Sequence, residues 1–185
     1  IGGVAYYNQY KYDLLQSNAT MDSNIINLAI KYNRLKRLVV LSSALIYENT
    51  SIYPTPESYS GSVPTLDYSF SKLFLERMVT AANKQYNIPY TILRLANVIG
   101  IGENQALKDV EKCSGNIKLM MSHVLPDFIN KTFQKQNPFY IFGEGQQTRC
   151  FTNGKDIARG VRLALESKLA LNDILNLSTN QQTTI

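Results

Sequence analysis

The segment R-L-V-V-L-S-S, residues 37–43, is a short run of apolar and β-branched residues that ends in two small hydroxyls. Such a run predicts a buried strand of a parallel sheet. Side chains at the carboxyl end of a strand in an open α/β sheet lie where such sheets bind ligands. The two serines are therefore the first candidates for a functional site.

The residues that follow this strand predict a βαβ unit. Residues 48–64 are rich in Ser, Thr, Pro, Gly and Tyr and predict a long irregular loop, a kind that is usually functional. A helix is expected next, with Asp67 as its N-cap and apolar residues such as Leu75 and Val79 along one face. A second strand is predicted at 90–95. In a right-handed crossover, both strand ends and the helix start face one crevice.

The predicted helix begins with Y-S-F-S-K, residues 68–72, which places a phenol and an ammonium one turn apart. A tyrosine that acts as an acid or base near neutrality needs its pKa lowered by about three units, or roughly 4 kcal/mol. A lysine charge about 4 Å away supplies about that much at an effective dielectric of about 20. The same spacing recurs at 7–11 and 32–36 in a chain with 12 tyrosines. Only Tyr68 belongs to the predicted crevice.

The flanking segments predict further helices and strands. A 20-residue amphipathic helix is expected at about 13–32, from the apolar spacing of Leu14, Met21, Ile25, Leu28 and Tyr32. Residues 100–118 are expected to be irregular. The later elements are a helix at 122–133, a strand at 139–142, a turn at 143–145, an extended stretch at 146–151, a helix at 156–165 and a strand at 174–177.

The Gly143-Glu144-Gly145 turn is not a dinucleotide fingerprint. Thr148 stands where the third glycine would be, and extended chain rather than a helix follows. No glycine-rich phosphate loop is present elsewhere in the 185 residues.

Composition excludes several classes of function. With 44% hydrophobic and 18% charged residues, the sequence is typical of a folded globular domain, and no apolar run approaches the length of a membrane span. We expect no membrane partner and no secretory leader. The net charge of +5 comes from scattered residues, so nucleic-acid binding is not predicted. Two distant cysteines and a single histidine argue against zinc and against Ser-His-Asp catalysis, and favour a reduced, cytoplasmic setting.

Five segments, in chain order, resemble the extended short-chain dehydrogenase/reductases, in particular the nucleotide-sugar epimerases, dehydratases and 4-keto reductases. They are L-V-V-L-S-S-A-L-I-Y (38–47), Y-S-F-S-K (68–72), P-Y-T-I-L-R-L-A-N-V-I-G (89–100), S-H-V-L-P (122–126) and G-E-G-Q-Q-T-R-C-F-T (143–152). The resemblance covers nearly the whole chain. GDP-fucose synthases and GDP-mannose 3,5-epimerases are the nearest forms.

The resemblance implies roles for seven residues. Ser43 would hydrogen-bond the substrate hydroxyl or keto group, and Tyr68 would be the acid/base. Lys72 would bind the nicotinamide ribose and lower the pKa of Tyr68, and Asn18 would lie near the cofactor, although a solvated helix face also explains Asn18. The residues implied to contact the diphosphate and nucleotide of the substrate are Asn97, His123 and Arg149. An ordinary helix residue remains an equal reading of His123, and a surface arginine remains an alternative for Arg149.

The implied function is NAD- or NADP-dependent hydride transfer at C4 of a nucleotide-diphosphate sugar. Leu45 stands where 3,5-epimerases carry a cysteine, and Ala44-Leu45 replaces the Asp-Glu pair of dehydratases. These departures favour a 4-epimerase or a 4-keto reductase. The alternative from another class is a non-catalytic Rossmann-type nucleotide-binding or regulatory protein.

The expected fold is α/β, with a Rossmann-like parallel sheet flanked by helices. Residues 1–100 would form the C-terminal half of a dinucleotide-binding domain, whose N-terminal half with its glycine-rich loop is expected upstream of residue 1. Residues 101–185 would form a substrate-binding region interleaved with the last sheet elements. The helices at about 13–32 and 68–86 are expected to pair across a homodimer as a four-helix bundle.

Overall fold

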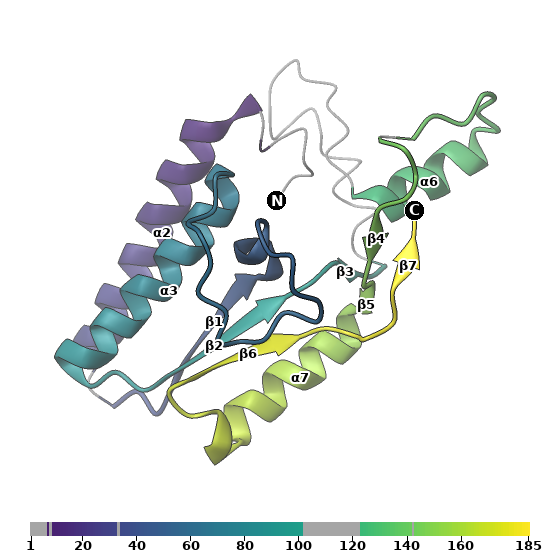
Figure 1. Cartoon of the computed structure of the whole chain (residues 1–185). Helices are drawn as coiled ribbons and strands as arrows, with labels where there is room; N and C mark the ends of the chain where they lie inside the picture. The colour runs from purple at the N-terminus through teal and green to yellow at the C-terminus, as the bar shows by residue number, and fades with distance from the viewer. Residues whose placement is uncertain (1–6, 8, 33, 102–122, 142) are drawn as a thin grey trace.

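The computed structural model describes residues 7, 9–32, 34–101, 123–141 and 143–185 (Figure 1). Three predictions lie outside them: the irregular segment over 102–118, Ser122 and Phe142. In chain order the elements are α2 (Lys11–Lys31), β1 (Leu38–Ser43), η1 (Ala44–Tyr47), α3 (Asp67–Tyr86), β2 (Tyr90–Leu95), β3 (Val98–Ile99), α6 (Val124–Phe133), β4 (Thr148–Arg149), β5 (Thr152–Asn153), α7 (Gly154–Glu166), η2 (Lys168–Ala170), β6 (Asp173–Leu177) and β7 (Thr183–Thr184).

The main sheet has three parallel strands in the order β1-β2-β6. The unit β1–α3–β2 is the predicted crossover, and β2 has the predicted bounds. Between Glu48 and Leu66 the chain forms no helix or strand, as expected for the long loop. The α/β fold with a parallel sheet and flanking helices is therefore confirmed.

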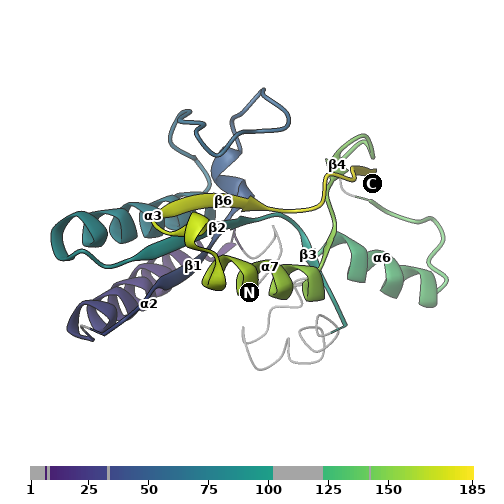
Figure 2. The same cartoon turned by 90° about the horizontal axis from the view of Figure 1, so that it is seen from below.

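Helices cover both faces of this sheet (Figures 1 and 2). α2 and α3 lie side by side on one face, and α7 lies on the other. The central strand β2 is buried along nearly its whole length, as expected for a parallel strand that is covered on both faces. Ile92 contributes to the core beneath α2 and α3, and Leu93, the next residue, contributes to the core beneath α7.

The buried face of α2 differs from the predicted apolar stripe. Leu14 is buried as expected, but the other buried residues of this helix are Asp22, Ile26 and Ala29. The remaining members of the predicted stripe are exposed, namely Met21, Ile25, Leu28 and Tyr32. α2 therefore has two apolar faces, and only one of them packs on this chain.

Two local predictions are wrong. Asp67 does not cap α3: the N-cap position is Leu66, with no side-chain cap. Instead Glu48 accepts hydrogen bonds from the amides of Thr65 and Leu66, at 2.5 and 3.1 Å, and so supplies a carboxylate to the helix start from across the loop. Residues 139–141 form no strand. The Tyr140 carbonyl instead accepts a hydrogen bond from Lys131 of α6.

Two short strand pairs, β3 with β5 and β4 with β7, lie beyond the carboxyl ends of the main sheet, close to α6 (Figure 1). The division at residue 100 stays a prediction. Among the described residues, no helix combines the length and apolarity that crossing a bilayer requires.

Candidate functional site

The carboxyl end of β1 supplies the first predicted site residue, Ser43. Its side chain is buried, and its Oγ accepts a hydrogen bond from the Leu45 amide at 3.2 Å, which caps the short helix η1. The Ser43 hydroxyl also interacts with the phenol of Tyr68 and lowers the pKa of that phenol. One serine thus joins the strand end to the start of α3.

Tyr68 and Lys72 lie on one face of the first turns of α3, as their spacing predicts. The Lys72 Nζ donates a hydrogen bond to the Leu41 carbonyl of β1 at 3.1 Å and lies 5.9 Å from the centroid of the Tyr68 ring. Ser43, Tyr68 and Lys72 therefore meet at the carboxyl edge of the sheet, the edge at which open α/β sheets bind ligands.

The direction of the Tyr68 pKa corrects the prediction. Burial raises the pKa of Tyr68, and the hydrogen bond from Ser43 lowers it only in part. The expected lowering by Lys72 assumed a charge about 4 Å away and ignored desolvation. Burial also lowers the pKa of Lys72, because the low dielectric disfavours the ammonium. The phenol of Tyr68 is therefore protonated at neutral pH.

α2 brings two polar residues to this cluster. The Asn18 Nδ2 donates to the Ser71 Oγ at 3.0 Å, and Ser71 in turn donates to the Tyr68 carbonyl at 2.8 Å. Asp22 is buried on the same helix. Burial raises the pKa of Asp22 and the charge of Lys72 opposes this, while Asp22 raises the pKa of Lys72 against its own burial. Sequence reasoning missed Asp22, whose position one turn after Asn18 was the available signal.

Tyr7 also reaches the site, although its segment showed no periodicity. Its ring stacks on the Tyr68 ring with centroids 4.6 Å apart and planes at 1°. Burial, and then Tyr68, raise the pKa of Tyr7. The second aromatic ring covers one face of the Tyr68 ring, which stays partly exposed.

A second missed feature is the buried ion pair of Glu76 and Arg94. The Arg94 Nη2 lies 2.7 Å from the Glu76 Oε2, and the two side chains are 6% and 4% exposed. Glu76 lies one further turn along the Tyr68–Lys72 face of α3. Arg94 is the single charge within the apolar strand β2, and that was the signal in the sequence.

The three residues predicted to contact the nucleotide do not join this cluster. Asn97 is exposed just after β2, His123 is exposed at the N-terminus of α6, and Arg149 is exposed on β4. The Nη1 of Arg149 donates to the Thr148 carbonyl at 2.7 Å. All three belong to the segments that extend past the carboxyl ends of the sheet (Figure 1).

The ammonium of Lys72 fits the ribose of a nicotinamide cofactor. It has three protons, and within the described residues one of them is used, on the Leu41 carbonyl. The other two carry no hydrogen bond that the structure records among the described residues, which is compatible with a ribose ligand. In the part of the chain that the structure describes, no group of three or more His, Cys, Asp or Glu residues could hold a metal ion.

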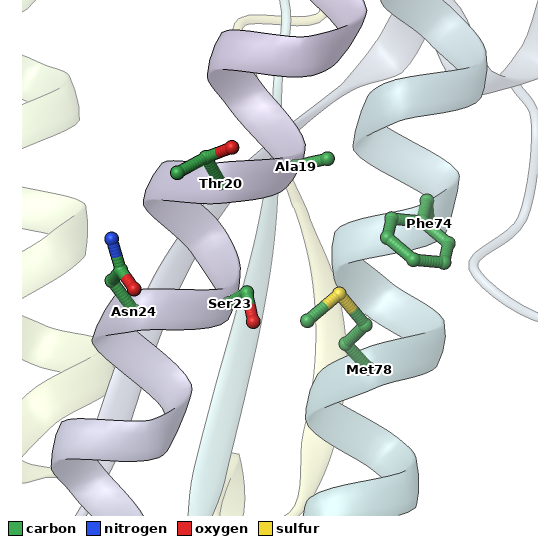
Figure 3. Close-up of a pocket in the computed structure, with 6 residues that line it drawn as sticks. All are labelled: Ala19, Thr20, Ser23, Asn24, Phe74 and Met78. Carbon is green, nitrogen blue, oxygen red and sulfur yellow. The ribbon is translucent and has the colours of Figure 1, made fainter.

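A separate open hollow of about 390 Å³ lies on the outer side of the α2–α3 pair (Figure 3). Its lining residues are Ala19, Thr20, Ser23, Asn24, Phe74 and Met78. None of them belongs to the cluster at the sheet edge, so we assign the chemistry to the cluster and not to this hollow.

Comparison with known proteins relates the chain to enzymes of nucleotide sugars. A putative UDP-glucose 4-epimerase of Methanocaldococcus jannaschii is 32% identical over 88% of this chain and 47% of its own length. The GDP-L-fucose synthase of Escherichia coli is 26% identical over 85% of this chain and 48% of its own length. The chain thus spans about half the length of the curated relatives it matches.

Solved structures share the fold. The UDP-glucose 4-epimerase of Thermotoga maritima, solved with UDP-glucose, superposes with a TM-score of 0.81 at 23% identity, over 100% of this chain and 54% of its own. The UDP-glucuronic acid 4-epimerase of Bacillus cereus, solved with UDP-glucuronic acid and NAD, gives a TM-score of 0.67 at 23% identity, over 91% of this chain and 48% of its own. These likenesses confirm the Rossmann-like architecture.

A family model described as the NAD dependent epimerase/dehydratase family matches residues 1–178, almost the entire chain. The family description confirms the expected nicotinamide cofactor at the level of the family. The chain belongs to the NAD-dependent epimerase/dehydratase family.

Proposed function

We propose that the protein carrying this chain is an NAD(P)-dependent nucleotide-sugar 4-epimerase or 4-keto reductase, with Tyr68 as its acid/base. The observation that carries the proposal is the meeting of Ser43, Tyr68 and Lys72 at the carboxyl edge of a parallel sheet. Relatives that act on UDP- and GDP-sugars support the substrate class.

The nicotinamide, when bound, supplies the carbon that gives or takes the hydride at the sugar C4. The residues of this chain supply position and the proton. Ser43 donates a hydrogen bond to the C4 oxygen and orients it, and Tyr68 gives its phenolic proton to that oxygen as the keto group is reduced. The raised pKa of Tyr68 suits this direction, because the phenol is protonated beforehand. In the oxidative direction the same oxygen takes the proton back.

Lys72 would hold the ribose hydroxyls and balance charge on the phenolate that forms. Its ammonium is tied to the Leu41 carbonyl, which restricts its position before ligands bind. Asn18 would support this arrangement, since Asn18 is linked by hydrogen bonds through Ser71 to the backbone of Tyr68. The carboxylate of Asp22 favours the charged form of Lys72.

Asn97, His123 and Arg149 are proposed contacts of the substrate's diphosphate and nucleotide. All three are exposed beyond the strand ends, where a ligand that extends outward from the Ser43–Tyr68 pair would meet them. A guanidinium matches phosphate oxygens well, which makes Arg149 the strongest of the three.

A homodimer through α2 and α3 is part of the proposal. Large apolar side chains are exposed on both helices: Met21, Ile25 and Leu28 on α2, Tyr32 at its C-cap, and Phe70 and Phe74 on α3. Phe74 also lines the hollow between the two helices (Figure 3). A second copy would cover these side chains. A cytoplasmic location remains a prediction from the cysteine content.

The decisive experiment is a Tyr68→Phe variant of the full-length protein, assayed for conversion of UDP- and GDP-sugars with NAD and NADP. Loss of the phenolic proton donor should lower kcat by a factor of about 10²–10⁴ and leave nucleotide binding in place. Unchanged turnover would exclude the acid/base role. Binding of nucleotide sugar by the wild type without any turnover would favour the non-catalytic alternative.

A further inference from the structure

A row of three polar side chains crosses the sheet near its carboxyl edge. Ser42 pairs in register with Arg94, and Arg94 pairs in register with Asn176. Partners in parallel strands project to the same face, so Ser42 and Arg94 lie side by side against Glu76 of α3, and Asn176 lies next to them against the long loop. Val40 and Ile92, one step earlier on that face, belong to the apolar core. The polar row, Ser42–Arg94–Asn176, therefore separates the core from the crevice.

Glu76 joins this row to the helix that carries the proposed acid/base. Its Oε1 accepts hydrogen bonds from the Ser42 Oγ at 2.5 Å and the Arg94 Nε at 3.0 Å, and its Oε2 accepts from the Arg94 Nη2 at 2.7 Å. One carboxylate thus bonds the ends of two neighbouring strands. Because Tyr68 and Lys72 lie on the same helical face, this contact fixes how far α3 extends past the strand ends.

Arg94 and Asn176 of the polar row also hydrogen-bond the long loop that follows η1. The Arg94 Nη1 donates to the Tyr47 hydroxyl at 2.6 Å and to the Glu57 carbonyl at 2.9 Å, and Tyr47 donates to the Asn176 Oδ1 at 2.9 Å. The side-chain Nδ2 of Asn176 donates to the Thr55 carbonyl at 2.9 Å, and the backbone amide of Asn176 donates to the Glu57 Oε1 at 3.0 Å. The loop after η1 is therefore attached to the polar row at both Thr55 and Glu57.

We propose that Glu76 and Arg94 are positioning residues that hold Tyr68 against Ser43 and hold the long loop beside this pair. Neither side chain needs to touch the reacting atoms, because both act through the placement of α3, the strand ends and the loop. A displacement of about 1 Å at a reacting pair can reduce turnover about hundredfold. The kinetic part rests on the proposed function, whereas the structural part does not.

The kinetic test is a double-mutant cycle in the full-length protein. Glu76→Gln should lower kcat about tenfold or more with little change in KM, since the acid/base is misplaced while the ligand contacts remain. In a Ser43→Ala background, where the Ser43–Tyr68 contact is already lost, the same change should cost less than about threefold. Non-additivity of this kind marks residues that act as one unit. Equal factors in the two backgrounds would overturn the proposal.

The structural test needs neither substrate nor cofactor. Arg94→Lys keeps a positive charge beside Glu76 but removes the two Nη1 hydrogen bonds. We expect the amides of Tyr59, bonded to the Pro56 carbonyl, and of Asn176 to exchange with deuterium about tenfold faster. The Ile92 amide should be unchanged, which shows that the core is intact. Unchanged exchange at Tyr59 and Asn176 would overturn the proposal. If the wild type turned over no nucleotide sugar, the proposed function would fail. The exchange measurement would still show whether Arg94 holds the long loop.

Discussion

Replacing Arg94 by methionine should strongly destabilise the fold. The variant leaves the Glu76 carboxylate buried and removes two of the three hydrogen bonds that it accepts within the described chain. Breaking a buried ion pair in this way costs about 3–5 kcal/mol, because an uncompensated charge stays in a low dielectric. With a urea dependence of about 1–3 kcal/mol per molar, the unfolding midpoint should fall by about 1–5 M.

The assay is urea unfolding of the full-length protein followed by far-UV circular dichroism. Arg162→Met is the matched control, since Arg162 forms a 3.9 Å pair with Glu166 on α7 in which both side chains are about two-thirds exposed. Such surface pairs contribute less than about 1 kcal/mol. A second variant that combines Glu76→Leu with Arg94→Met should recover most of the loss, because neither charge is then left unpaired. A loss below about 1 kcal/mol for Arg94→Met alone would refute the reasoning.

Four further outcomes are expected. Asp22→Asn should lower the pKa of Lys72 further, because it removes the carboxylate that raises this pKa. The pKa is measured by NMR of the lysine side chain, and a value equal to or above that of the wild type would contradict the prediction. The pKa of Lys72 is lower in the folded than in the unfolded chain, so the unfolded chain binds more protons between the two values and stability rises with pH in that window. Lys72→Met should flatten this rise relative to the wild type, and an identical pH dependence of urea unfolding would contradict it. Leu28→Arg should give a monomer by light scattering at micromolar concentration, whereas Leu169→Arg, at a residue that is 92% exposed outside the helix pair, should not. Arg149→Ala should raise KM for the nucleotide sugar about tenfold or more with a smaller change in kcat, and an unchanged KM would exclude the phosphate contact.

Most of the main sheet could be predicted from the sequence because its signals are local. A β-branched run, a long polar loop, a helical repeat and a second apolar run give β1, α3 and β2 in order. The meeting of Ser43 and Tyr68 then follows from the topology alone, since both lie at the carboxyl side of one crossover. Local patterns also misled: Asp67 has the residue type of a cap, but the carboxylate at the start of α3 comes from Glu48, 17 residues before Thr65.

The sign of the Tyr68 pKa shift could not be predicted from spacing. The estimate from the sequence contained one Coulomb interaction at an assumed distance. The folded chain adds desolvation by neighbours that no local pattern identifies, including Tyr7, which stacks on Tyr68 from 61 positions earlier. Burial is the largest influence on the pKa of Tyr68, and the Lys72 ammonium, itself desolvated, lies 5.9 Å from the ring centroid rather than at the assumed distance of about 4 Å. A pair of residue types fixes the possible chemistry, and the surrounding burial fixes which protonation state is present.

The role of Arg94 in the polar row could not be predicted from apolar periodicity. Within β2 the arginine occupies a position that the pattern assigns to the core, and a charge there is costly unless a partner meets it. The partners belong to α3 and to two other strands, so only the register of the sheet reveals them. A fully paired arginine in that position fixes the register of three strands at the edge where Ser43 lies. We therefore expect substitutions that preserve the charge of Arg94 but lose its planar geometry to affect turnover more than stability, because positioning depends on direction while the ion pair depends mainly on charge.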